Sequence, residues 1–216
     1  MNVEPLYGLR VRTPRLELRV PTAAELELLY EVAAAGIHPS DVMPFGVAWT
    51  DCLTREGFLD YHRHTLESWR PESWKFDLGT WAEGVLVGVQ GFGADGFPES
   101  RTVGTGSWLG ARHQGRGIGT EVRTAVIELA FRHLGAETVT SAAFEANVAS
   151  RRVFEKLGYR VAGHNTLSPR GTPQPHVLLR LDRGDWAGAP FRVDARVPTR
   201  AARSSAPASA DSSAQS

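Results

Sequence analysis

The sequence predicts a three-layer α/β sandwich, in which helices cover both faces of one mixed β-sheet. The first observation is an antiparallel meander: "WKFDLGTW" (74–81) and "VLVGVQGF" (85–92) have a period of two and flank a short turn, and "TVGTGSWL" (102–109) follows. The second is a strand–helix–strand unit, because an apolar helical stretch at 119–134 separates 102–109 from a further strand at 137–144. Such a crossover makes its two strands parallel, so the sheet is mixed.

The remaining elements follow in chain order. "RLELRV" (15–20) alternates like a strand, and Thr22 with Glu25 has the spacing of a capping box at the start of a first helix. Residues 36–50 form a loop rich in Pro and Gly that is unusually apolar, and a second helix is expected over 51–70. Gly135 ends the 119–134 helix, and Gly158 ends a short one over 147–157. The last strands are "YRVAG" and "HVLLRL".

Composition limits the function classes. The chain has 216 residues, of which 42% are hydrophobic, and this suits one globular domain. Its 24 basic and 24 acidic residues balance, so strong non-specific attraction to nucleic acid or to anionic membranes is not expected. Cys52 is the single cysteine, which excludes an intrachain disulfide and a thiolate metal cluster. We expect a soluble, cytoplasmic protein without a bound metal.

The end of the chain differs in kind from the rest. "RAARSSAPASADSSAQS" consists almost wholly of Ala, Ser, Arg and Pro and has no large apolar side chain. Such a segment cannot bury enough apolar surface to offset the loss of chain entropy on ordering. The sequence therefore predicts a folded domain over 1–193 and a disordered tail over 194–216.

The stretch "QGRGIGTE" (114–121) has three glycines in five positions between a strand and a helix. A P-loop would need Lys and a hydroxyl residue after Gly115, and Arg116-Gly117 stands there instead. A dinucleotide fingerprint also fails, because its third glycine position is Thr120 or Val122. Backbone N–H groups at such a turn, with a helix dipole behind them, suit a pyrophosphate. The alternative is a tight strand-to-helix connection without a ligand.

This turn resembles the Q/R-x-x-G-x-G/A signature of the GNAT superfamily of N-acyltransferases. A second motif agrees: "NVASRRVFEKLGY" (147–159) looks like the N-x-x-S-x-x-V-x-E-K-L-G-[FY] segment of the RimJ/RimL-like branch. The resemblance covers about residues 13–186. "MPFGVAWT" and "GSWLG" are further similar to an actinobacterial subgroup, some of whose members use succinyl-CoA.

The resemblance implies a GNAT-type sheet whose fourth and fifth strands (102–109 and 137–144) splay apart to admit the pantetheine of acyl-CoA. Gly104 and Gly106 are expected to mark a bulge that opens the fourth strand. An amine would attack the thioester directly in a ternary complex. The expected acyl-CoA contacts are Trp108, Leu109, Gln114, Gly115, Arg116, Gly117, Ile118, Gly119, Thr120, Asn147 and Ser150.

The same resemblance assigns the catalytic groups. Many members of the superfamily use a tyrosine as general acid where this chain has Phe154, so Ser150 is the expected acid. Glu145, just past the fifth strand, is the candidate base, although Asp41, His38 or a water chain would also serve. The alternative to a catalytic Ser150 is an ordinary hydroxyl in the first turn of a helix. The alternative to an acyl-CoA contact at Asn147 is an N-cap without a ligand. His62 and His64 point to different helix faces, which is poor metal geometry.

Several choices stay open at this level. Acetyl-CoA and succinyl-CoA are both candidate donors, and a succinyl carboxylate would need a cation near the acyl end. The loop 36–50 contains no Lys or Arg and only His38 as a potential cation. The acceptor amine is not identified, and a homodimer is an option. A non-catalytic acyl-CoA-binding sensor is the rival function, because no base stands out and Phe154 cannot donate a proton.

Overall fold

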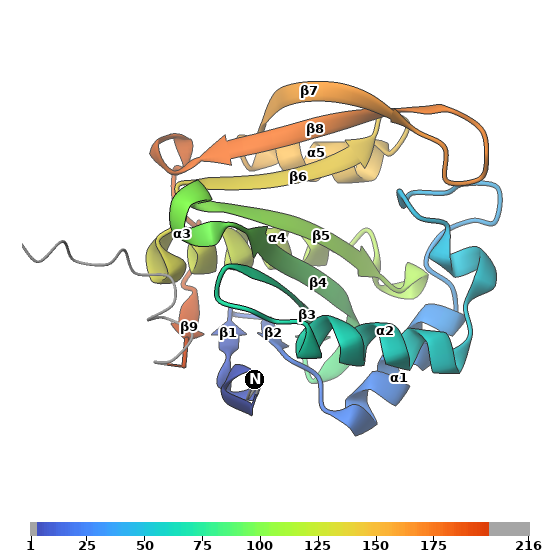
Figure 1. The fold of residues 1–216 in the computed structure, drawn as a ribbon, viewed down its shortest axis with the longest axis horizontal. Coiled ribbons are helices and arrows are strands. Elements are labelled where there is room, and N and C mark those ends of the chain that lie inside the picture. Colours follow the sequence, from blue (N-terminus) through green and yellow to red (C-terminus); the bar gives the residue numbers. More distant parts are fainter. Residues whose placement is uncertain (1–3, 199–216) are drawn as a thin grey trace, which may run out of the picture.

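The computed structural model of the protein describes residues 4–198. In this part of the chain nine strands form one sheet in the order β7-β8-β6-β5-β4-β3-β2-β1-β9 (Figure 1). The strands are β1 (Arg10–Arg12), β2 (Leu16–Arg19), β3 (Ser73–Ala82), β4 (Val85–Asp95), β5 (Thr102–Leu109), β6 (Thr138–Phe144), β7 (Arg160–Leu167), β8 (Gln174–Asp182) and β9 (Asp194–Arg196). Among them β5 and β6 are the parallel pair, which the crossover predicted.

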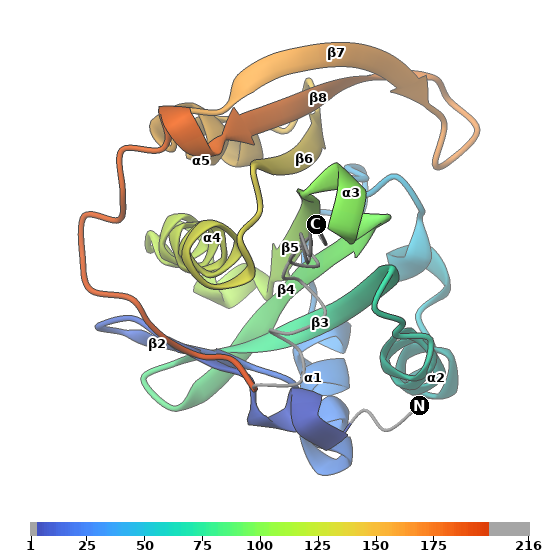
Figure 2. The same cartoon turned by 60° about the vertical axis from the view of Figure 1, so that its left-hand side comes forward.

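Helices cover both faces of this sheet, as Figure 2 shows. The α-helices are α1 (Ala23–Ala34), α2 (Arg55–Glu67), α3 (Phe97–Ser100), α4 (Ile118–Glu128) and α5 (Val148–Lys156). Shorter turns are η1 (Glu4–Gly8), η2 (Trp49–Cys52), η3 (Ala111–His113), η4 (Leu129–Leu134) and η5 (Arg183–Asp185). α1 and α2 pack on β4 and β3, whereas α4 packs on β1, β2, β4 and β5 from the opposite side. The predicted three-layer α/β sandwich is confirmed.

Two groups of buried side chains hold the layers together. The larger one includes the inner faces of α4 and α5, with Val122, Val126 and Phe154 against strand residues such as Val103 and Val139. The smaller one lies under α1 and α2 and includes Leu29, Phe58 and Val89 with Trp108 packed against it. α4 is buried nearly all round, and a π-turn extends it to Gly135, whose φ of 70° ends the helix as predicted.

Two expectations about strands are wrong. The register between β4 and β5 runs without a shift from Gly93–Gly104 to Gly88–Leu109, so no bulge lies at Gly104 or Gly106. The opening arises instead because β5 leaves β6. The predicted tail also begins too early, since Asp194–Arg196 forms β9 and pairs with β1. The rest of the predicted tail, residues 199–216, lies outside the described residues.

We expect a chain that ends at Arg192 to be less stable than the full chain. The cut removes the β1–β9 ladder and the contacts of Val193, Ala195 and Val197 with the larger core. Burial of three half-exposed apolar side chains corresponds to about 1–3 kcal/mol of unfolding free energy. Urea unfolding measures this, with a chain ending at Pro198 as the control that keeps β9. Equal stability of the two truncated chains would show that β9 contributes nothing.

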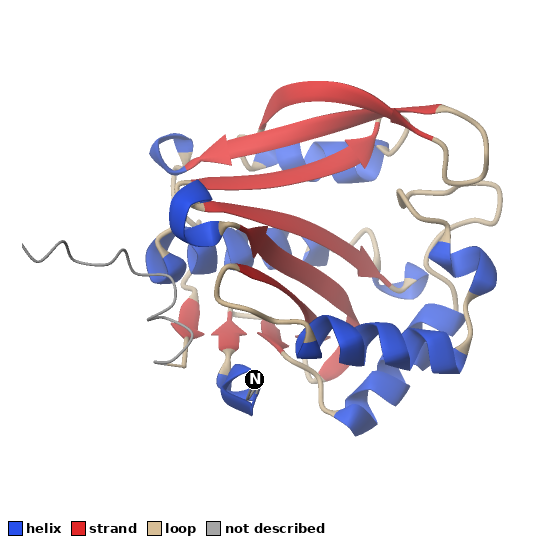
Figure 3. Ribbon diagram, viewed as in Figure 1, coloured by secondary structure: helices blue, strands red, loops and turns tan. Residues whose placement is uncertain are grey.

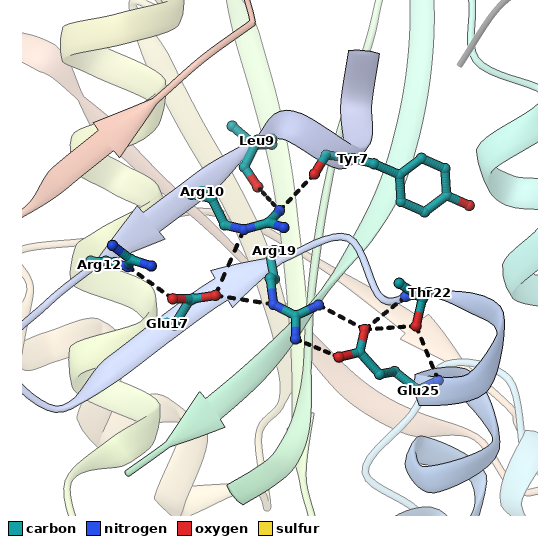
Figure 4. Close-up of polar contacts among 8 residues, drawn as sticks. All are labelled: Tyr7, Leu9, Arg10, Arg12, Glu17, Arg19, Thr22 and Glu25. Carbon is teal, nitrogen blue, oxygen red and sulfur yellow. Dashed lines mark hydrogen bonds and ion pairs between the residues drawn. The ribbon is translucent and has the colours of Figure 1, made fainter. Parts of the chain in front are cut away.

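α1 begins at the predicted capping box (Figure 4). The Thr22 hydroxyl accepts from the Glu25 N–H at 3.3 Å, and the Glu25 carboxylate accepts from the Thr22 N–H at 2.9 Å. Arg19, from β2, donates to both Glu25 oxygens at 2.7 and 2.5 Å and stacks over the Trp81 ring. These hydrogen bonds lower the pKa of Glu25 from 4.5 to about 2, and the bond from Arg19 has the largest effect.

Glu25→Gln should therefore destabilise the protein in a pH-dependent way. A lowered folded-state pKa stabilises the fold above the unfolded-state value, and that stabilisation is lost as pH falls. Near neutral pH we expect a loss of about 1–2 kcal/mol, as for hydrogen bonds to a charged group. The difference between variant and wild type should shrink as pH falls from 4.5 to about 2. Urea midpoints across this interval measure it, and a pH-independent difference would contradict the assignment.

Within the described residues, no helix is long and apolar enough to cross a membrane.

Candidate active site

The central feature of the sheet is the separation of β5 from β6. The two strands pair only over Thr102–Gly104 and Thr138–Thr140. Beyond that point β5 continues along β4 to Leu109, and β6 continues along β8 to Phe144. Gly106 and Ser107 are consequently exposed although they lie in the middle of a nine-stranded sheet. The predicted splay is present, and it leaves one edge of β5 free for a ligand.

Side chains join β5 and β6 at the apex of this opening, which is the point where the backbone pairing of the two strands ends. The Thr105 hydroxyl donates to the Thr140 carbonyl at 3.0 Å, and the Ser141 hydroxyl donates to the Thr105 carbonyl at 2.8 Å. These bonds replace the backbone ladder that ends one residue earlier. Arg123 reaches the same point from α4 and donates to the hydroxyls of Thr105, Ser107 and Ser141.

The glycine turn lies just beyond the free end of β5, after the short turn η3. Gly115 and Gly117 have φ values of 74° and 77°, a region that other residues rarely adopt. Gly117 is the N-cap of α4 and supplies no capping side chain, so the first N–H groups of the helix remain available. The positive end of the helix dipole adds to them. This arrangement is an anion site that fits a pyrophosphate.

An arginine that is distant in sequence contacts this turn. Arg15, from the β1–β2 connection, contacts the buried carboxylate of Glu121 at 2.6 Å and donates to the Arg116 carbonyl at 3.3 Å. Its guanidinium lies beside Gly117, and it adds positive charge at the anion site. His113 adds none at neutral pH, because burial, with Arg112 and Arg116 nearby, lowers the pKa of its imidazole.

Other predicted acyl-CoA contacts lie on different sides of the sheet. The Gln114 side chain donates to the carbonyls of Ile37 and Leu109, and its backbone N–H donates to the Ala111 carbonyl, so Gln114 anchors the turn. Leu109 packs against the larger core on the α4 side. Trp108 points the other way, with its ring 5.9 Å from Trp49. Trp108 therefore belongs to the α1–α2 side of the opening.

α5 begins at the end of β6. Asn147 is its N-cap, and its side-chain oxygen accepts from the Ser150 N–H at 3.1 Å. The Ser150 hydroxyl is half-buried and has no hydrogen-bond partner among the described residues. Phe154 is 2% exposed and its ring faces Arg123, so this position supplies no acid. Glu145 is exposed, just beyond β6.

The apolar loop between α1 and α2 meets the connection between β7 and β8 (Figures 1 and 3). Arg170 donates to both Asp51 oxygens at 2.6 and 2.7 Å and to the Ser40 carbonyl at 2.8 Å. His38 is also engaged, because Nδ1 lies 2.8 Å from the Pro39 carbonyl and Nε2 2.8 Å from the Thr50 hydroxyl. Neither side chain is free to meet a ligand carboxylate.

Two other expectations concern histidine and metals. His62 is buried, and its Nδ1 lies 3.1 Å from Asp77, whereas His64 is exposed. The described residues contain no group of three His, Cys, Asp or Glu side chains able to hold a metal ion. His62 and Asp77 also line a cavity of about 290 Å³ between α1, α2 and β3, which includes none of the predicted acyl-CoA contacts.

Sequence reasoning missed several side chains of this region. Arg15 and Arg170 act across long sequence separations and belong to no motif. Arg123 had one detectable signal, because it lies within the apolar run "EVRTAVIELAF", where a charged residue has no exposed face. Ser107 and Ser141 gave no signal, since serine is common in loops and strand ends.

Comparison with known proteins agrees with this geometry. Residues 15–160 match the acetyltransferase (GNAT) domain family. Among solved structures, RimJ from Mycobacterium smegmatis, in complex with CoA-disulfide, has a TM-score of 0.67 at 17% identity and covers 86% of this chain and 92% of its own. RimL, a ribosomal L7/L12 alpha-N-protein acetyltransferase in complex with coenzyme A, has a TM-score of 0.67 at 15% identity, with 79% and 95% covered.

A chimera of the Vibrio cholerae spermidine N-acetyltransferase SpeG and hSSAT is also similar, with a TM-score of 0.63 at 11% identity and with 79% and 96% of the chains covered. At these identities the structures support the fold alone, whereas the domain match spans more than half of the chain. Together with the splayed strands and the glycine turn, that match shows that the protein is an acetyltransferase of the GNAT family.

Proposed function

We propose that the protein transfers an acetyl group from acetyl-CoA to an amine by direct attack within a ternary complex. The observation that carries this proposal is the unpaired edge of β5, which leads into a helix N-terminus without a capping side chain. A pyrophosphate on the N–H groups of residues 115–119 would place pantetheine along that edge. Loop 36–50 and Trp108 lie on the opposite face and would border the acceptor.

Ser150 is the proposed general acid in this reaction. Its hydroxyl has no other partner among the described residues, and it lies in the first turn of α5, beside the end of β6. Glu145 is the proposed base, since its exposed carboxylate follows the last residue of β6. Both assignments depend on the family resemblance for their chemical roles.

The contacts of the acceptor loop favour acetyl-CoA over succinyl-CoA. A succinyl carboxylate placed there would need a free cation, because a desolvated carboxylate without a partner is costly. Both nitrogens of His38 are engaged, and Arg170 is paired with Asp51. We expect kcat/KM for acetyl-CoA to exceed that for succinyl-CoA by at least about tenfold, which equals about 1.4 kcal/mol. Equal values, or a preference for succinyl-CoA, would overturn this choice of donor.

Release of free CoA thiol tests the proposed activity itself. The acceptor panel should contain a peptide with a free α-amine, a lysine side-chain amine, spermidine and an aminoglycoside. We expect at least one of them to give CoA faster than acetyl-CoA hydrolysis without an acceptor. Tight CoA binding without turnover on an extended amine panel would instead support the acyl-CoA sensor.

A further inference from the structure

Arg123 is a buried cation that faces no carboxylate of the described residues. It is 4% exposed, and it donates hydrogen bonds to the hydroxyls of Thr105, Ser107 and Ser141, at 3.0 Å for Ser107 and 3.4 Å for Ser141. Its Nε has no partner among the described residues, and no carboxylate faces it. Buried arginines are almost always paired with an acid, because desolvation of a charge is costly. The position of this charge therefore requires an explanation.

The cluster around Arg123 keeps its positive charge at working pH. Burial lowers the pKa of Arg123, but a guanidinium is a strong enough base to stay protonated at working pH. On the side of α5, the Cζ atom of Arg123 lies 5.1 Å from the centroid of the Phe154 ring. The phenol of Tyr159 is also close to this guanidinium. Burial raises the pKa of Tyr159 above its usual value of 10.0, so the phenol is neutral. β5 and β6 contribute hydroxyls alone.

Ser107 is the member of this cluster that faces the opening. The protons of Thr105 and Ser141 are already donated to backbone carbonyls. The Ser107 oxygen accepts from Arg123, and its own proton has no acceptor among the described residues. Ser107 is exposed on the edge of β5 that β6 leaves free. A hydroxyl that accepts a hydrogen bond from a cation becomes a stronger donor.

We propose that Ser107, polarised by Arg123, donates a hydrogen bond to the CoA sulfur and stabilises the thiolate that leaves during acyl transfer. This inference rests on the proposed function, because it needs acyl-CoA along β5. The amine nitrogen forms the new C–N bond, the C–S bond breaks, and the electron pair stays on sulfur. The amine proton goes to the base or to solvent. Ser107 touches the reacting atom, and Arg123 is a positioning residue that acts through it.

Ser107 and Ser150 have different roles in this scheme. Ser150 transfers a proton to the thiolate, whereas Ser107 and Arg123 keep their protons and lower the free energy of the anion. Because the charge of Arg123 is permanent, its effect on the sulfur also exists in the complex with free CoA. That complex allows a test that needs neither an acceptor nor turnover.

The test is the pKa of the thiol in bound CoA, followed by the ultraviolet absorbance of the thiolate with desulfo-CoA as the blank. In wild type we expect this pKa to lie about one unit or more below the ordinary thiol value of about 8.5. Ser107→Ala and Arg123→Met should each return it to that value. Ser141→Ala is the matched control, because Ser141 touches the same guanidinium but already donates to Thr105. It should leave the thiol pKa lowered.

The outcomes separate the inference from the proposed function. Absence of CoA binding by wild type in calorimetry would overturn the proposed function. CoA binding with the same thiol pKa in wild type, Ser107→Ala and Arg123→Met would overturn this inference, and Arg123 would then only join the strands. A loss confined to succinyl-CoA turnover in Arg123→Met would also overturn it, since the cation would then meet an acyl carboxylate. If Arg123→Met does not fold, the thiol pKa in Ser107→Ala is sufficient for the test, because Ser107 is exposed and its replacement should leave the fold intact.

Discussion

Gly119→Val is expected to lower the affinity for CoA by at least about 100-fold, which corresponds to about 2.7 kcal/mol. The branched side chain would stand where backbone N–H groups at the start of α4 approach the pyrophosphate. The fold has room for the change, because a Cβ at Gly119 meets only the end of Leu109, at 3.9 Å. Calorimetry on the folded variant measures the affinity. Unchanged affinity would remove this turn from the binding site.

Gly119 is a better test position than Gly117. A valine at Gly117 also removes space near the pyrophosphate, but the φ of 77° there strains any branched residue. A loss of affinity in Gly117→Val would therefore combine two causes. Gly184→Val is a suitable control, because a Cβ there meets nothing within 4 Å and the residue lies in η5, outside the turn. The control should bind CoA as wild type does.

Ser150→Ala is expected to lower kcat by about 100-fold, at the low end of the range for general acid catalysis. CoA is a fairly good leaving group, so proton transfer assists the reaction without being indispensable. CoA affinity should hardly change, because the hydroxyl acts mainly in the transition state. The Asn147 cap should also persist, since it uses the backbone N–H of Ser150 and not the hydroxyl.

The measurement for Ser150→Ala is single-turnover kinetics, under conditions where chemistry limits the rate. Ser168→Ala, outside α5, serves as a control for the loss of a hydroxyl. Unchanged kcat in Ser150→Ala would mean that this residue is an ordinary helix hydroxyl and that water protonates the thiolate. Phe154→Tyr is a poor rescue, because the ring is buried against Arg123 and Tyr159.

Elements with local sequence signals could be predicted before the structure was known. Period-two alternation gave the β3–β4 hairpin, and the 119–134 periodicity with Gly135 gave α4 and its extension. The glycine turn was also readable, since φ values of 74° and 77° at Gly115 and Gly117 are backbone states that favour glycine. The Asn147 cap followed from its place before a short helix.

The length of the β5–β6 pairing and the side chains that meet at its end depend on tertiary packing. The apolar run around Arg123 indicates that this residue is buried, but the hydroxyl groups that it contacts follow only from the packing of α4 under the apex of the opening. Arg15 and Glu121 are 106 residues apart, and Arg170 and Asp51 are 119 apart. β9 is three residues long, too short to show a period, and β1 is its partner only because the sheet places them side by side. Such contacts depend on packing between distant segments, which local pattern does not encode.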